Sequence, residues 1–262
     1  MNHPAHSLSS KGLVLDQVTK SFGSVPAVDR LCLRVDHREF IAIVGPTGCG
    51  KTTLLRLVAG TEKMDSGHIY IDGQCVNDVQ PSDRGVRMVF QDNALWPHMR
   101  VFEKDAISNL SFGSKIRKHL PQRIEETVNI VTNRLGIART LFPRKPHQLS
   151  AGQKQMVGIG RAMTIIPRIF LMDEPLANVD PQNRLNLRKE IKNYHNKMES
   201  MTLYVTHNLP EAFWLADRVA IMQAGTILQI ESPSELYRHP VNEFVRDFIR
   251  CFEMDKLPFV SR

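Results

Sequence analysis

The chain has few cysteines and no long apolar run. Its 262 residues include four scattered cysteines, and none of them belongs to a C-x-x-C pair. This spacing argues against a zinc site and for reduced thiols. No apolar run approaches the roughly 18 residues that span a bilayer, and the N-terminal segment MNHPAHSLSSKG lacks the apolar core of a signal peptide. We therefore expect a protein of the cytoplasm that can dock on a membrane protein.

The chain also lacks a concentrated basic region. Lys and Arg number 34 against 27 Asp and Glu, and this excess of +7 is spread along the sequence. No basic block or aromatic-basic alternation favours nucleic acid, whereas a modest basic excess also suits nucleotides or an anionic inner leaflet. A hydrophobic content of 42% is ordinary for a globular protein of one large or two small domains.

Apolar patterning predicts an α/β protein with a largely parallel core sheet. Strands are expected at 13–22, 29–45, 84–91, 168–173 and 201–207, with hairpins turning at 72–73 and 224–225. Helices are expected at 51–60, 181–198 and 209–219, and as short segments within 233–252. Between 92 and 163 the pattern becomes helical, so we expect this segment to be inserted into the α/β core.

The segment GPTGCGKT, Gly45 to Thr52, fits G-x-x-x-x-G-K-[ST] and lies between an expected strand and an expected helix. Glycines let successive backbone N–H groups point inward at phosphate oxygens, and the helix adds its positive N-terminal end. Lys51 would supply a charge to the β- and γ-phosphates, and Thr52 a hydroxyl to Mg²⁺. The flanking strand and helix make a chance glycine turn the weaker interpretation.

A second candidate site follows the apolar strand in RIFLMDEP. Asp173 and Glu174 come at its carboxyl end, where ligands bind in α/β sheets. Asp173 can hold Mg²⁺ directly or through water, and Glu174 is placed to take a proton from an attacking water. Alone, the pair would be an acidic turn; beside a phosphate loop, the catalytic interpretation is favoured.

The segment LSAGQ, residues 149–153, predicts a helix start. Ser150 can be the N-cap, and Gln153, three residues on, can reach back to the cap backbone. Gly152 then falls at the second helical position, where a bare backbone could approach a phosphate. The segment is therefore either a capped helix only or also an anion clamp.

Two more features complete an ordered set: Gln91 at the end of the expected strand RMVFQ, and His207 at the end of MTLYVTH. The five motifs together resemble the nucleotide-binding subunits of ABC transporters over about residues 12–250. The resemblance implies a P-loop NTPase core with a mostly parallel sheet, an N-terminal antiparallel β part and an inserted helical subdomain. It divides the chain into a tail 1–11, a single nucleotide-binding domain 12–250 with core 12–91 and 164–235 and helical subdomain 92–163, and a C-terminal helical extension 236–262.

In that family two domains pair head-to-tail around two ATP molecules, and the resemblance implies a role for each matching residue. Catalysis would rest on Glu174, His207, Gln91 and Lys51, and Mg²⁺ on Thr52, Gln91 and Asp173. Asp180 would lie at the dimer interface. ATP would contact Phe22 through its adenine and, through its phosphates, Gly45, Pro46, Thr47, Gly48, Cys49, Gly50, Lys51, Thr52 and Thr53, with Ser150, Gly152 and Gln153 acting on the partner's ATP.

Each residue outside the phosphate loop has a plainer interpretation when taken alone. Phe22 could be a core aromatic, Asp180 before Pro181 a helix N-cap, and His207 a structural histidine. The sequence departs from the family pattern at four positions. Arg38 stands where glycine is usual, Met156 stands where arginine is usual, and Ala177 and Val179 modify the loop around Asp180. None of these departures removes a group with an assigned catalytic role.

Segments 82–113 and 232–249 are most similar to importer ATPases of the sugar, polyamine and ferric-iron type. Those relatives usually continue into a C-terminal regulatory domain, and we expect none in this chain. The resemblance implies an ATPase that powers solute import at the cytoplasmic face of the inner membrane. Expected partners are a second ATP-binding subunit, in a homodimer, permease subunits and a solute-binding protein, with no nucleic acid. The alternative is a non-transport ABC ATPase acting on nucleic acid or ribosomes.

Overall fold

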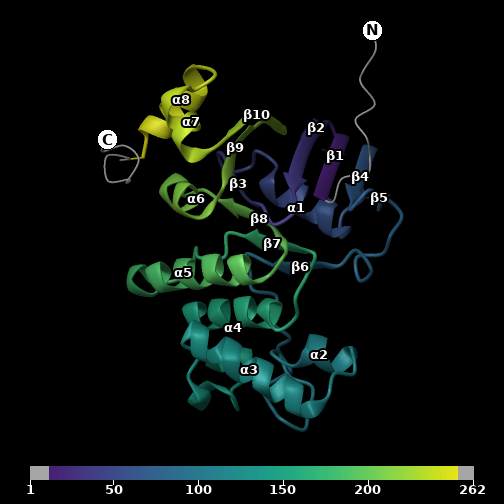
Figure 1. Cartoon of the computed structure of the whole chain (residues 1–262), viewed down its shortest axis with the longest axis vertical. Coiled ribbons are helices and arrows are strands. Elements are labelled where there is room, and N and C mark those ends of the chain that lie inside the picture. Colours follow the sequence, from purple (N-terminus) through teal and green to yellow (C-terminus); the bar gives the residue numbers. More distant parts are fainter. Residues whose placement is uncertain (1–11, 253–262) are drawn as a thin grey trace. The chain divides into compact units, whose positions relative to one another are not determined.

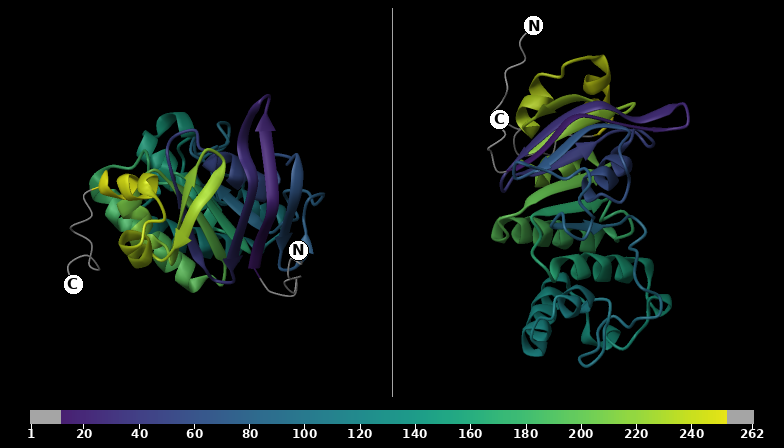
Figure 2. Two further views of the ribbon diagram at one scale, coloured as in Figure 1. Left: turned by 90° about the horizontal axis from the view of Figure 1, so that it is seen from above. Right: turned by 90° about the vertical axis from the view of Figure 1, so that its right-hand side faces the viewer.

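The computed structural model describes residues 12–252. These residues form two compact units, each shown as a ribbon in Figures 1 and 2. The first unit comprises the chain up to Val86, Arg168–Leu171 and the chain from Glu199 onward. The second comprises Arg87–Pro167 and Met172–Met198. Both units are assembled from segments that are distant in sequence.

An antiparallel sheet opens the first unit. It contains β1 (Gly12–Phe22), β2 (Val25–Asp36), β4 (Ser66–Ile71) and β5 (Gln74–Cys75) in the order β2-β1-β4-β5. In β2, Leu31, Leu33 and Val35 are buried while the residues between them are exposed, which is the two-residue period of a half-buried strand. The expected N-terminal antiparallel part and the hairpin at Asp72–Gly73 are confirmed.

The second sheet has the order β10-β9-β3-β8-β7-β6. Its strands are β3 (Phe40–Val44), β6 (Val86–Val89), β7 (Ile169–Asp173), β8 (Met201–Thr206), β9 (Arg218–Gln223) and β10 (Thr226–Glu231). Strand β3 runs parallel to both β8 and β9, and every residue of β3 and β8 is buried, as expected for a strand covered on both faces. The β9–β10 hairpin closes one edge.

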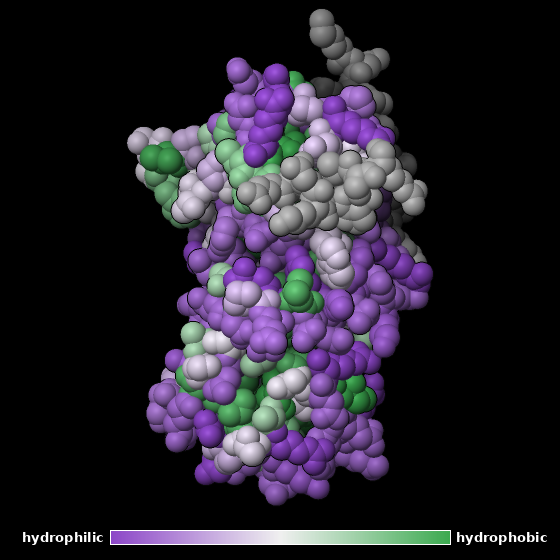
Figure 3. Space-filling model, turned by 90° about the vertical axis from the view of Figure 1, so that its left-hand side faces the viewer, coloured by the Kyte–Doolittle hydropathy of each residue, from purple (hydrophilic) through white to green (hydrophobic). Residues whose placement is uncertain are grey.

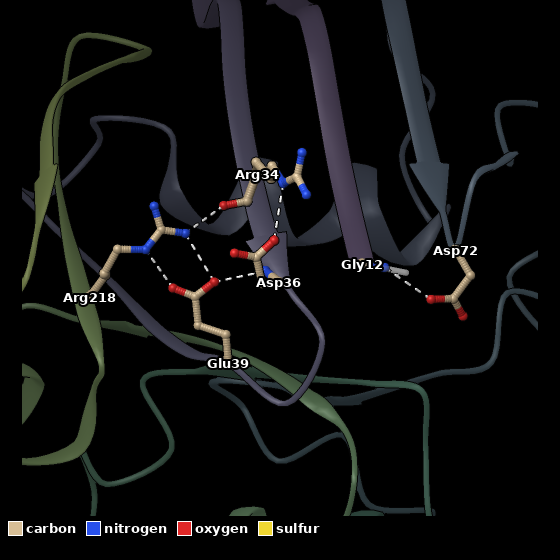
Figure 4. Close-up of polar contacts among 6 residues, drawn as sticks. All are labelled: Gly12, Arg34, Asp36, Glu39, Asp72 and Arg218. Carbon is tan, nitrogen blue, oxygen red and sulfur yellow. Dashed lines mark hydrogen bonds and ion pairs between the residues drawn. The ribbon is translucent and has the colours of Figure 1, made fainter. Parts of the chain in front are cut away.

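Two sequence predictions need correction. Residues 29–45 do not form one strand, because a turn separates β2 from β3 and the two strands belong to different sheets. Glu39 stabilises this turn: its carboxylate accepts a bond from Asp36 N at 2.7 Å and binds Arg218 of β9 at 2.5 and 2.9 Å (Figure 4). Gln91 does not end its strand either, since β6 stops at Val89.

The first unit contains helices α1 (Lys51–Ala59), α6 (Leu209–Leu215), α7 (Pro233–Arg238) and α8 (Glu243–Arg250). Helix α1 ends at Gly60, which has φ 78, as the sequence predicted. Helices α6, α7 and α8 contribute Phe213, Leu236 and Ile249 to a buried cluster with Ala42 and Val44 of β3. Strand β3, which leads into the phosphate loop, is therefore packed against a buried apolar cluster.

The second unit contains α2 (Phe112–Ile116), α3 (Pro121–Leu135), α4 (Ala151–Met163) and α5 (Pro181–Lys197), with short 3-10 turns at Arg139–Leu141 and Pro146–Gln148. Between β6 and α2 the chain forms neither helix nor strand, so the helical pattern expected from residue 92 begins only at Phe112. Within the described range 12–252, no helix combines the length and apolarity that crossing a membrane requires.

Candidate functional site

The phosphate loop, Gly45–Thr53, starts where β3 and β8 of the first unit end side by side, next to β9. Val44, the last residue of β3, is in register with Thr206 of β8 and Ile221 of β9. The residues that follow, Gly45 and His207, therefore leave the same edge of the sheet. This is the edge where α/β sheets bind ligands.

Two glycines of the loop are required by close packing against distant segments. A β-carbon on Gly45 would lie 2.1 Å from the carbonyl oxygen of Met222, and one on Gly50 would lie 1.9 Å from that of Ala27. Gly50 also has φ 107, which L side chains rarely adopt. Gly225 N adds a bond of 3.0 Å to Cys49 O. The loop is thus held between the start of β2 and the β9–β10 hairpin.

Lys51 is buried, with 7% of its surface exposed. Its Nζ donates to Gly45 O at 2.8 Å and Pro46 O at 2.9 Å, and it lies 3.7 Å from Cys49 Sγ. These contacts hold an ammonium group inside the curl of the loop, at the N-terminus of α1. An anion that entered the loop would meet this charge together with the positive end of the helix.

Phe22 and His207 are both exposed in the first unit. Phe22 pairs with Val25 across the β1–β2 hairpin, and 52% of its surface is accessible, so it is not a core aromatic. His207 stands between β8 and α6, where Asn208 donates its N–H to Thr206 Oγ1 at 3.0 Å and caps α6 by accepting from Glu211 N at 2.9 Å. These bonds fix the backbone on either side of the histidine.

The LSAGQ segment lies in the second unit and forms the predicted capping box. Ser150 Oγ accepts from Gln153 N at 3.3 Å, and Gln153 Oε1 accepts from Ser150 N at 3.0 Å. Ser150 and Ala151 are exposed, and a β-carbon on Gly152 would meet only Asn178 O, at 3.4 Å. The first turn of α4 is therefore an accessible helix N-terminus.

The acidic residues of the second unit follow β7. Asp173 is its last residue and is buried, whereas Glu174 is half-buried with φ 45 in the left-handed region. Such strained backbone gathers at functional sites. Asp180 caps α5, and its pKa lies below the ordinary value because Asn183 donates backbone and side-chain bonds to it. The N-cap interpretation of Asp180 is confirmed. Gln91 is exposed.

Mg²⁺ keeps several waters and binds through one or two carboxylates together with substrate phosphates. Among the residues that the structure describes, no group of three or more His, Cys, Asp or Glu side chains could hold a metal ion by itself. Thr52, Gln91 and Asp173 each offer the oxygen donor that Mg²⁺ prefers. This donor chemistry fits a cation that arrives with a nucleotide.

Two sets of contacts were not predicted from the sequence: those of the residues that pack against the phosphate loop, and those of Arg161. Ala27, Met222 and Gly225 carry no motif of their own, although the Ala224-Gly225 turn was located. Arg161 donates to Ala94 O at 2.7 Å and Asn93 O at 3.1 Å, and its guanidinium lies 4.7 Å from the Trp96 ring centre. A basic residue on the apolar helix α4 was the available signal, but its targets lie 67 and 68 residues away.

This fold and this loop define a phosphate-binding protein of the P-loop class. The family model described as ABC transporter matches residues 28–177, and the chain belongs to that family. The resemblance drawn from the motifs is confirmed, and so is the predicted fold class. A solved dimer of the ATP-binding cassette MJ0796, bound to ADP and Pi, superposes with a TM-score of 0.73 at 25% identity, covering 84% of this chain and 98% of that one.

Several curated relatives are named as import proteins. The chain is 46% identical over 250 residues to the sn-glycerol-3-phosphate import ATP-binding protein UgpC of Yersinia enterocolitica, covering 94% of this chain and 66% of UgpC. It is 44% identical over 246 residues to the maltose/maltodextrin import ATP-binding protein MalK of Yersinia pestis, covering 94% and 65% respectively. The chain thus spans about two thirds of the length of these relatives.

Proposed function

We propose that the protein is an ATP-binding and ATP-hydrolysing subunit that powers solute import through ATP-driven dimer closure. The observation that carries this proposal is the phosphate loop. Lys51 lies within bonding distance of two loop carbonyls, and close packing leaves no room for a side chain at Gly45 or Gly50. The names of UgpC and MalK support import over an action on nucleic acid or ribosomes. We also propose residues 92–163 as the helical subdomain that couples ATP to transport.

The proposed roles follow the family resemblance. Lys51 and the loop backbone hold the phosphates, His207 holds the γ-phosphate and Glu174 takes a proton from water. Ser150, Gly152 and Gln153 complete the site of a second subunit. Closure is favoured because ATP then contacts two surfaces, so the closed pair binds it better than the open pair. Asp180 belongs to the interface of this pair.

Mg²⁺, held by Thr52, Gln91 and Asp173 together with the phosphates, would supply charge neutralisation when bound. Residues of the chain itself supply the remaining stabilisation of the transition state. Lys51 and the N-terminus of α1 offset negative charge that develops on the γ-phosphoryl oxygens. Glu174 is the only residue to which we assign proton transfer.

We propose permease subunits, with a solute-binding protein, as partners at the cytoplasmic face of the inner membrane. The second unit carries exposed large apolar residues: Ile107, Ile116, Leu120, Ile130, Ile166 and Leu185. Apolar side chains gather on the lower part of the face in Figure 3, at the level of α3 and α4 in Figure 1. Exposed apolar side chains that gather on one face support a contact with another protein.

A purified-protein assay tests the function. Wild type should hydrolyse ATP, and Glu174→Gln should abolish turnover while retaining ATP-bound dimers, because the amide keeps the shape of the carboxylate but cannot accept the proton. Glu190→Gln, on α5, is a matched control. Undiminished hydrolysis in Glu174→Gln would overturn the role of Glu174. Copurification with a polytopic membrane protein, rather than with RNA or DNA, would separate import from the alternative.

A further inference from the structure

Lys20 lies beneath the aromatic ring to which we assign adenine. Lys20 and Phe22 are two residues apart on β1, so their side chains leave the same face of the strand. The Lys20 ammonium lies 5.2 Å from the centre of the Phe22 ring, within cation–π range. One side of the ring therefore faces a cation, although half of the side chain remains accessible.

An acidic pair holds this ammonium in place. Lys20 Nζ lies 3.0 Å from Glu62 Oε1 and 3.4 Å from Asp65 Oδ1, and only 14% of the lysine side chain is exposed. The hydrogen bond that Lys20 donates to the Glu62 carboxylate is the largest cause of the raised Lys20 pKa, so the ammonium stays protonated well above neutral pH. A lysine restrained by two carboxylates is a fixed charge rather than a mobile surface group.

The loop between α1 and β4, which contains Glu62 and Asp65, also fixes the backbone next to Phe22. Asp65 Oδ2 accepts from Ser21 N at 2.6 Å, and Asp65 N donates to Thr19 O at 2.8 Å. Glu62 and Asp65 follow the C-terminal end of α1, the helix that begins at Lys51. The ring is therefore anchored to the helix that starts from the phosphate loop.

The tip of the β1–β2 hairpin is also near the phosphate loop. Phe22 pairs with Val25, and Ala27, two residues further along β2, packs its carbonyl against Gly50. Two residues of strand span about 7 Å. The aromatic ring and the phosphate cradle thus belong to one assembly within the first unit.

We propose that Lys20 is a positioning and specificity residue for the base of the bound nucleotide. Its charge draws electron density from the covered face of Phe22, which lowers the repulsion between the π systems of the ring and a purine stacked on the other face. Its ion pairs also prevent the ring from turning away. This inference rests on the proposed ATP-binding function and concerns affinity for the base, not for the phosphates.

The test compares binding of ATP with binding of inorganic triphosphate, each by calorimetry with Mg²⁺. Lys20→Met should weaken ATP binding by about two- to fivefold, the range of an exposed cation–π contact, and leave triphosphate binding unchanged. Lys20→Arg should restore most of the loss, since guanidinium also binds aromatic faces. Lys63→Met, in the same α1–β4 loop, is the matched charge control and should bind ATP like wild type.

A double-mutant cycle removes a purely structural explanation. In a Phe22→Leu background, Lys20→Met should produce no further loss, because the aromatic face is already absent. If Lys20→Met does not fold, Glu62→Gln replaces it and should give a smaller loss of ATP affinity. Equal weakening of ATP and triphosphate, an additive cycle, or no effect would overturn the inference. A wild-type protein that binds neither ligand would instead overturn the proposed function.

Discussion

A β-carbon on Gly45 would lie 2.1 Å from the carbonyl oxygen of Met222, a residue 177 positions away along the chain. The phosphate loop is therefore shaped from outside as well as by its own glycines. Gly48 provides the contrast: its φ is 82, but a β-carbon there would meet nothing within 4 Å. One glycine is required by contact, the other by backbone conformation.

Gly45→Ala should consequently disrupt the loop more than Gly48→Ala. The first change forces backbone apart at the end of β3, whereas the second costs roughly 1 kcal/mol of left-handed strain in open space. We expect Gly45→Ala to abolish ATP binding and lower the melting temperature. Gly48→Ala should lower the melting temperature less. Calorimetry and thermal unfolding test this, and a larger loss of stability for Gly48→Ala would contradict the assigned packing.

Lys51→Met should abolish hydrolysis and also remove stabilisation by MgATP. Wild type at a hundredfold excess of ATP over its Kd should gain about 2.7 kcal/mol of unfolding free energy. The variant should gain almost none, because the ammonium that meets the phosphates is gone. The measurement is thermal unfolding with and without MgATP. Arg56→Met, an exposed change on the same helix, should behave like wild type.

Gly152→Asp should block ATP-driven dimerisation, whereas Ala151→Gly should change little. The chain has room for a side chain at 152, since a β-carbon would meet only Asn178 O at 3.4 Å. The loss would then come from repulsion between the new carboxylate and a partner's ATP, not from misfolding. Sedimentation of each variant with ATP, in a Glu174→Gln background, measures the fraction of dimer. Similar losses from both changes would contradict this account of the segment.

Arg38→Gly should stabilise the protein by about 0.5–1 kcal/mol, because Arg38 has φ 63 and left-handed backbone is costly for any residue with a β-carbon. Its ion pair with Glu199 joins side chains that are 58% and 70% exposed, so it contributes little. Urea unfolding gives the value. Glu199→Gln is the control and should shift stability by less than about 0.5 kcal/mol; a larger loss there would show that the ion pair matters.

Arg161→Lys should destabilise the protein by about 1–3 kcal/mol, even though the charge is kept. Burial lowers the pKa of Arg161 to about 10, so its guanidinium is charged at neutral pH in both the folded and the unfolded protein. Only a planar guanidinium can bond the carbonyls of Asn93 and Ala94 together and face Trp96. Urea unfolding measures the loss, and Lys154→Met on the same helix should cause much less. Equal stability of Arg161→Lys and wild type would contradict the assigned contacts.

Several features could be predicted from the sequence because their causes are local. The capping box of Ser150 and Gln153 joins residues three apart, and the C-cap at Gly60 follows from the end of one helix. The order of the motifs likewise sufficed to identify the family. Where a tertiary contact ended an element, prediction failed: residues 29–45 looked continuous, yet Glu39 and Arg218 stabilise a turn there.

The remaining features required the tertiary structure. Nothing near Gly45 in the sequence indicates Met222, and nothing near Lys20 indicates Glu62. The sequence by itself determined the phosphate loop and the capped start of α4, because these depend on short-range spacing. It also predicted Glu174 as the general base. Only the tertiary structure decided what braces the loop and which charge lies under Phe22, because those contacts depend on how distant strands are ordered within the sheets.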